Sequence, residues 1–148
     1  MTVTWLLLFA IAAVLFAVLC WGFKPRDKGR MLKLGVFLAL FDFAFESAGA
    51  AADFWASKGS VLFLGAVPVE IFAVALFAGG AYALLFAPKF DLKTAAMVSV
   101  PIAVAGTAIE ALMISQGSLE YSLPWTAYLA LPAYWLAFLL VGYVNSRL

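Results

Sequence analysis

Four acidic side chains are the first candidates for chemistry in this sequence, because each lies within a long apolar segment. They are Asp42, Glu46, Glu70 and Glu110. An ionisable side chain inside a membrane costs several kcal/mol unless something compensates for it, and such residues commonly mark functional sites. The four-residue spacing of Asp42 and Glu46 places both on one face of a helix. That face must turn away from lipid and toward other helices.

The rise of an α-helix predicts how deep each acid lies. At about 1.5 Å per residue, Glu46 is expected roughly 9 Å from the outer end of its helix and Glu70 roughly 13 Å from the outer end of the next. Glu110 should reach a depth similar to Glu46, with Asp42 about one turn deeper. No lysine or arginine is expected at this depth. Carboxyls crowded in a low dielectric cannot all ionise, so this layer would offer an acid and a base together.

The composition predicts the environment of these acids. Of the 148 residues, 67% are hydrophobic, nine are basic, eight are acidic and none is histidine. A soluble domain has about a quarter of its residues charged, so this chain lacks a polar surface to present to water. Five apolar segments are long enough to cross a membrane as helices: residues 4–23, 31–52, 61–86, 94–114 and 125–144. We therefore expect a single all-α transmembrane domain of five helices over residues 1–148.

The basic residues of the short loops predict the orientation of the chain. Most of them follow the first and third segments or lie at the C-terminus: Lys24, Arg26, Lys28, Arg30, Lys33, Lys89, Lys93 and Arg147. The opposite side carries only Lys58. The N-terminus is therefore expected outside and the C-terminus in the cytoplasm of a prokaryotic-type plasma membrane. Because no positive stretch precedes the first segment, we expect it to be a retained span and not a signal peptide.

A shift of 64 residues predicts a weak internal repeat. It lays Glu46 on Glu110 and Pro68 on Pro132, and both glutamate and proline are scarce within the apolar segments. The second and third segments would then correspond to the fourth and fifth as a parallel repeat, with the first segment added. In many membrane proteins the substrate site lies at the interface between such repeats.

The remaining residues predict an apolar site without a metal or cofactor. With no histidine and only one cysteine, Cys20, the usual ligands of zinc, iron and haem are missing, although carboxylates alone leave magnesium formally open. Pro68 is expected to bend the third helix about one turn into the span, toward a cavity. Aromatic side chains gather toward the outer end, where an interfacial belt explains them as well as a ligand site does.

The segment around the acids resembles a known family. The run F-E-S-A-G-A-A-A-D-F-W, followed after a short loop by V-P-V-E-I-F, is similar to the lycopene cyclase domain family of small membrane-type carotenoid cyclases. The family motif is Pro-x-Glu-Glu near the start of a span. Pro68, Glu70 and Phe72 match it, while Ile71 stands where the second acid belongs. The resemblance covers about residues 41–86, and Trp55 lies where the family has a loop tryptophan.

The resemblance implies an isomerase that protonates a terminal carbon–carbon double bond of a long isoprenoid in carotenoid biosynthesis. The cation then closes a ring and a base removes a proton, whereas addition of water would make a hydratase. Glu70 and Glu46 would be acid and base in either order, with Glu110 supporting one of them. The residues expected around this substrate are Asp42, Trp55, Pro68, Phe72, Tyr121, Trp125 and Tyr134.

Two other functions remain open at this point. The same carboxylates would bind protons or cations in a small ion-coupled transporter. They would also hydrogen-bond neighbouring helices in a membrane subunit without catalysis. In each case the expected partners are membrane lipid and a second copy or another membrane chain, and no basic stripe for nucleic acid is present.

Overall fold

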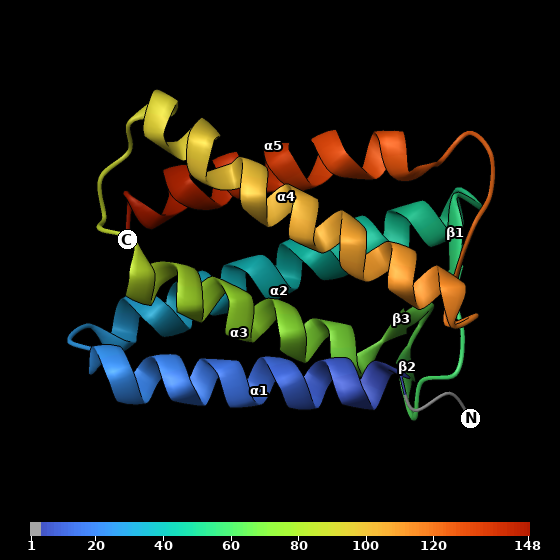
Figure 1. The fold of residues 1–148 in the computed structure, drawn as a ribbon, viewed down its shortest axis with the longest axis horizontal. Helices are drawn as coiled ribbons and strands as arrows, with labels where there is room; N and C mark the ends of the chain where they lie inside the picture. Colours follow the sequence, from blue (N-terminus) through green and yellow to red (C-terminus); the bar gives the residue numbers. More distant parts are fainter. Residues whose placement is uncertain (1–3) are drawn as a thin grey trace.

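The computed structural model describes residues 4–148 as a bundle of five helices with short strands at one end (Figure 1). The helices are α1 (Thr4–Phe23), α2 (Lys28–Ala51), α3 (Val69–Leu85), α4 (Leu92–Ser115) and α5 (Ala127–Asn145). The strands are β1 (Trp55–Ser57), β2 (Phe63–Leu64), β3 (Val67–Pro68) and β4 (Leu119–Tyr121). Successive helices run up and down, so the described chain starts at the strand end and finishes at the opposite end (Figure 1).

Four of these helices are compatible with a multi-pass membrane protein. Within the described residues, α1, α2, α4 and α5 are long and apolar enough to cross a membrane, and α3 is a shorter apolar helix of 17 residues. Large apolar side chains cover their outer faces, as at Leu15 on α1, 57% exposed, and Val104 on α4, 54% exposed. A face of this kind is stable only against lipid or another protein.

The third helix begins later than the sequence predicts. A helix was expected from Val61, but β2 and β3 form an antiparallel hairpin there and α3 starts only at Val69. Gly65 turns this hairpin with a φ of 64°, a left-handed conformation that glycine adopts without a steric penalty. Pro68 is the N-cap of α3, with its φ of −60°. The expectation that Pro68 bends the helix from within is therefore wrong, because it precedes the first helical residue.

Helices α2 and α4 agree with the 64-residue shift, whereas α5 begins six residues before the position that α3 would predict for it. Both ends of α2 and α4 differ by 64 residues, and an aspartate caps each N-terminus. Asp27 accepts a hydrogen bond from the backbone N–H three residues ahead at 2.8 Å, and Asp91 does the same at 2.8 Å. Just beyond the C-termini, Asp53 and Gly117 both have a positive φ, of 56° and 69°. Helices α2 and α4 run in the same direction, as a parallel repeat requires (Figure 1).

The two repeats meet through a short two-stranded sheet that the sequence did not predict. Strands β1 and β4 pair antiparallel, with Ala56 opposite Glu120, its own equivalent in the other repeat. Lys58 N–H donates to the carbonyl of Ser118 at 2.9 Å, and Ser122 N–H donates to that of Phe54 at 2.8 Å. Replacing each residue of one bond by its equivalent 64 residues away in the other repeat gives the second bond. A local two-fold relation therefore joins the repeats and places equivalent residues across from each other.

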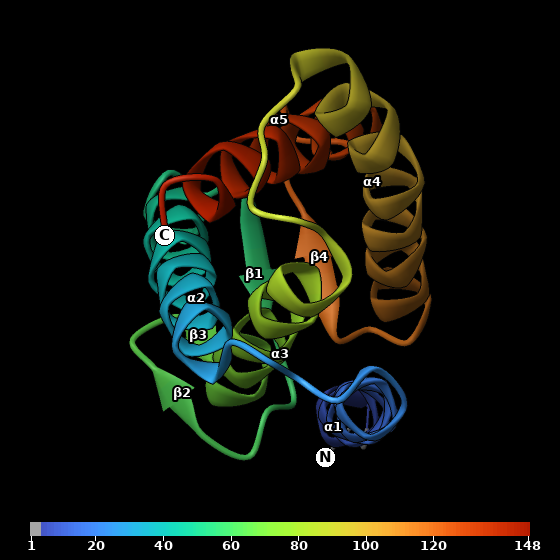
Figure 2. The same ribbon diagram turned by 90° about the vertical axis from the view of Figure 1, so that its left-hand side faces the viewer.

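Close packing of α2 on α3 and of α4 on α5 sets the shape of the bundle, with α3 lying between α1 and α2 (Figure 2). A Cβ added to Gly35 on α2 would come within 2.6 Å of the Leu76 carbonyl on α3, so only glycine allows this approach. Helix α1 adds to the outside of α3, where Phe16 and Phe77 stack with centroids 5.3 Å apart. The first helix is thus an addition to the repeat.

Candidate functional site

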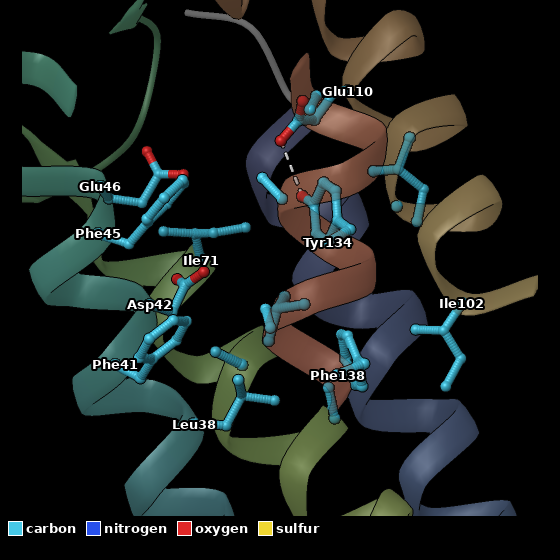
Figure 3. A pocket seen from close by; sticks show the side chains of 18 of the residues that line it. Leu38, Phe41, Asp42, Phe45, Glu46, Ile71, Ile102, Glu110, Tyr134 and Phe138 are labelled. Atoms are coloured by element: carbon cyan, nitrogen blue, oxygen red, sulfur yellow. Dashed lines mark hydrogen bonds between the residues drawn. The ribbon is translucent and has the colours of Figure 1, made fainter. Parts of the chain in front are cut away.

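A cavity of about 260 Å³ lies between α2, α3, α4 and α5. Its wall is mostly aliphatic and aromatic. The ionisable groups on it are the carboxyls of Asp42, Glu46 and Glu110 and the phenol of Tyr134. No lysine or arginine is among the described residues that line it. Figure 3 shows Asp42 and Glu46 on the α2 wall, with Glu110 and Tyr134 on the opposite wall.

Glu46 is held by a tryptophan from β1. The indole Nε1 of Trp55 donates to Glu46 Oε2 at 2.8 Å, and Trp55 is only 6% exposed. The ring packs directly against Gly49, one turn after Glu46 on α2. A Cβ at that glycine would lie 1.8 Å from Cζ2 of Trp55. The glycine thus makes room for the one side chain that donates a hydrogen bond to Glu46.

Glu110 is held by two tyrosines. The hydroxyl of Tyr134 on α5 donates to Glu110 Oε1 at 2.8 Å, and the hydroxyl of Tyr121 on β4 donates to Oε2. Gly106, one turn before Glu110, lets the Tyr134 ring approach α4. A Cβ there would lie 2.9 Å from the ring. Glu46 and Glu110 are equivalent in the repeat but differ in the donors that surround them.

Asp42 has an oxygen without a partner. Its Oδ2 is buried and forms no hydrogen bond to any described residue. It lies one turn along α2 from Glu46 and lines the cavity near Ile71 (Figure 3). A buried polar atom without a hydrogen bond costs about 1–3 kcal/mol, so this oxygen is a costly group to place on an apolar wall.

Glu70 lies outside this cavity, which corrects the prediction that three glutamates converge. Because α3 begins at Val69, Glu70 is in the first turn of the helix and not deep in a span. Its carboxylate accepts from the Ser60 hydroxyl at 2.5 Å and from Val61 N–H at 3.1 Å, so it holds the chain that leads into the β2–β3 hairpin. The neighbouring Ile71 lines the cavity in its place.

The other predicted residues divide between the cavity and its supports. Trp125 lines the cavity and meets Trp55 edge to face, with centroids 4.7 Å apart. Tyr121 reaches the site through Glu110, and together with Glu46, Trp55 and Trp125 it also lines a small second cavity at the strand end. Phe72 packs edge to face on Phe43 outside the cavity.

One buried support, Pro68, and three aromatic wall residues remain to be placed. Pro68 is buried in β3 and does not line the cavity. Sequence reasoning missed Phe41, Phe45 and Phe138, which form much of the aromatic wall. The signal for the first two was their position beside Asp42 and Glu46 on the same helix.

The lining of the cavity defines the class of site. No group of three or more histidine, cysteine or acidic side chains within residues 4–148 is placed to hold a metal ion. Comparisons with family models, curated proteins and solved structures found no match for this chain. The class is therefore set by the site itself, an apolar cavity between two helical repeats with carboxyls on facing walls.

Proposed function

We propose that this protein is a membrane enzyme of carotenoid-cyclase type, which protonates a carbon–carbon double bond of a long isoprenoid. The observation that carries the proposal is the cavity: its walls are apolar and aromatic, and the carboxyls of Asp42, Glu46 and Glu110 face into it without a cation. A polyene has no group for a lysine or arginine to bind, whereas it needs a proton donor, a proton acceptor and dry surroundings.

The proposal places all five helices across the membrane, with the N-terminus outside. Supporting it, the described helices lie side by side and alternate in direction (Figure 1). The turns after α1 and α3 and the C-terminus carry most of the basic residues, whereas Lys58 lies at the strand end, paired with Glu120 at 2.6 Å. Basic residues concentrate on the cytoplasmic side of membrane proteins. The strand end and the carboxyls near it then face the outer leaflet.

The proposed reaction is an isomerisation in which one proton is added to the substrate and one is removed. A carboxylic acid transfers its proton to one carbon of a terminal double bond, and the cation left on the other carbon is attacked by a second double bond. This closes a ring and moves the cation to a ring carbon. A carboxylate then removes a proton from the adjacent carbon and restores a double bond. Neither oxidant nor reductant is required, and a proton shared between the two carboxyls resets the site.

Glu46 and Glu110 are the pair we assign to these steps. They come from equivalent positions of α2 and α4 and line the same cavity from facing walls. Glu110 replaces Glu70 in the pair expected from the sequence, since Glu70 is bound to Ser60 and Val61. Aromatic faces such as Phe41 and Phe138 line the space between and would stabilise a cation by its attraction to their π-electrons.

The test is conversion of lycopene in cells that accumulate it, measured by chromatography and mass of the extracted pigment. The wild type should yield an isomer of equal mass that absorbs at shorter wavelength, or a hydrated product if water captures the cation. Glu46→Gln and Glu110→Gln should each lower conversion by about 100-fold or more, the usual effect of removing a general acid or base. Glu120→Gln, on the exposed face of β4, is the matched control and should convert normally.

Two results would overturn this proposal. One is a wild-type protein that is present in the membrane and leaves lycopene unchanged. The other is a Glu46→Gln, Glu110→Gln double variant that still converts it. Glu70→Gln separates the structure from the family motif: a loss of conversion by that variant at normal protein levels would return Glu70 to the catalytic pair.

The repeat favours a second candidate, a small proton-coupled transporter. Glu46 and Glu110 lie at the interface between two parallel repeats, where transporters commonly bind substrate and coupling ions. This candidate predicts proton flux into proteoliposomes that a pH gradient drives and that Glu46→Gln abolishes. Vesicles with wild-type protein that are as tight to protons as empty vesicles would exclude it.

A further inference from the structure

The cavity reaches the surface where its lining residues are exposed. On α4, Ala105 and Ile109 line the cavity and are also exposed, Ile109 by 41%. On α2 the exposed lining residue is Phe45, 39% exposed. These residues mark two places where the cavity meets the side of the bundle and not its ends.

The two places are equivalent in the repeat. A shift of 64 residues lays Phe41 on Ala105 and Phe45 on Ile109. Because α2 and α4 correspond over their whole lengths, one opening lies beside α2 and the other beside α4, related by the local two-fold. The repeat thus builds the same side opening twice, with different side chains at its edge.

Aromatic side chains fill the opening beside α2. Phe37, Phe41 and Phe45 stack along the helix, with centroids 6.1 and 6.4 Å apart. Phe45 continues this stack onto Trp55, at 5.4 Å, and meets Trp125 edge to face at 5.9 Å. The large rings leave little room for a ligand on this side.

Small and aliphatic side chains edge the opening beside α4. Helix α4 packs along α5, whereas its other neighbour across the cavity is α1, which contributes Leu8 to the lining. Trp5 of α1 packs with Met113 of α4 in one buried cluster at the strand end.

The cavity is too small to enclose a long chain. Sites that bury most of a drug-sized ligand have volumes of about 300–1,000 Å³, and this one has about 260 Å³. A long linear isoprenoid can therefore place only one end in the cavity. The rest must leave through an apolar opening, and one that faces the acyl chains of the bilayer keeps it out of water.

We propose that a long linear polyene enters this protein sideways from the lipid through the opening beside α4, edged by Ala105, Ile109 and Leu8, while the equivalent opening beside α2 is closed by its phenylalanines. The identity of the chain rests on the proposed function. The polyene end then lies between Glu46 and Glu110, and its length lies along α4 in the membrane. The enzyme therefore acts on one end of the polyene at a time.

The test measures lycopene bound per protein after gel filtration in detergent, separately from conversion. The variant designed to close the opening is Ala105→Phe with Ile109→Phe, called the closing variant. It gives α4 the phenylalanines that α2 has at the equivalent positions. Its matched control is Ala111→Phe with Leu112→Phe, two exposed α4 positions that do not line the cavity. The closing variant should bind at least about tenfold less lycopene than the wild type, equivalent to about 1.4 kcal/mol, and the control should bind normally.

Leu8→Phe narrows the same opening by a change on α1. It therefore tests the opening without altering α4, whose folding the closing variant could disturb. It should also lower bound lycopene while circular dichroism and elution volume stay unchanged. Wild-type binding by both the closing variant and Leu8→Phe would overturn the side opening, as would equal losses in the closing and control variants. A wild type that binds no lycopene overturns it too. Binding without conversion refutes the proposed enzyme and leaves the side opening supported by the difference between variants.

Discussion

Replacing Gly49 by alanine should disrupt the support of Glu46 although it adds only one methyl group. The new Cβ would lie 1.8 Å from Cζ2 of Trp55, and ordinary contacts begin at 3.4 Å, so the indole ring must retreat by the difference. The bond from its Nε1 to Glu46 is now 2.8 Å long and cannot survive such a shift. Both the packing of Trp55 and the position of the carboxyl therefore change.

Three contributions set the change in the free energy of unfolding. Overpacking a buried site costs about 1–3 kcal/mol, and a buried N–H left without an acceptor costs about 1–3 kcal/mol more. Alanine returns up to about 1 kcal/mol over glycine within a helix. Gly49→Ala should therefore lower the free energy of unfolding by about 1–5 kcal/mol. Gly22→Ala on α1, where a Cβ meets nothing within 4 Å, should not lower the free energy of unfolding.

The assay is unfolding in mixed micelles, followed by circular dichroism, in two backgrounds. In the Trp55→Ala background the obstructing ring is absent, so Gly49→Ala should become neutral or stabilising. This reversal of sign distinguishes a clash with Trp55 from a general cost of changing the helix. Equal effects of Gly49→Ala in both backgrounds, or the same stability as Gly22→Ala, would refute the role given to this glycine.

Two further predictions concern the opposite end of the bundle. Arg30→Met should lower the free energy of unfolding by about 2 kcal/mol, measured in the same micelles, because the guanidinium donates to the Ala83 carbonyl at 2.7 Å and to Asn145 Oδ1 at 3.1 Å. The hydroxyl and backbone N–H of Thr94 hold the pKa of Asp91 below its ordinary 3.8. The cap should therefore stabilise the fold above pH 3.8 and lose this as pH falls through the lower folded pKa. Asp91→Asn, which still caps, should remove that pH dependence.

The existence of the helices and the 64-residue match of α2 with α4 could be predicted because each depends on local or scarce signals. Long apolar runs define helices wherever lipid or a core surrounds them. Glu46 and Glu110, with Pro68 and Pro132, were enough to find the 64-residue shift, since few such residues occur in these segments. The facing of Glu46 and Glu110 across one cavity then follows from the repeat.

The β2–β3 hairpin could not be predicted, and the error about Glu70 follows from it. Its strand residues are apolar and continue the hydrophobic run of α3 without a break. Gly65, whose positive φ makes the turn, was the one local signal. Where a helix begins decides the depth of every residue after it. A start eight residues later moved Glu70 from several turns inside a span to the first turn of the helix, beside Ser60.

The equivalence of Glu70 and Tyr134 explains why the surroundings of Glu46 and Glu110 can differ. The shift of 64 residues lays one on the other, and Tyr134 donates to Glu110 from this position at 2.8 Å. The same contact in the first repeat would bring Glu70 against Glu46, two carboxyls with no donor between them. Instead Glu70 turns to the hairpin, and Trp55 supplies the donor to Glu46 at 2.8 Å. Two carboxyls in identical surroundings would bind a proton equally well. The proposed mechanism needs one protonated and one ionised carboxyl, and therefore different surroundings. The hairpin binds Glu70 whereas Tyr134 donates to Glu110, so Glu46 and Glu110 have different donors around them.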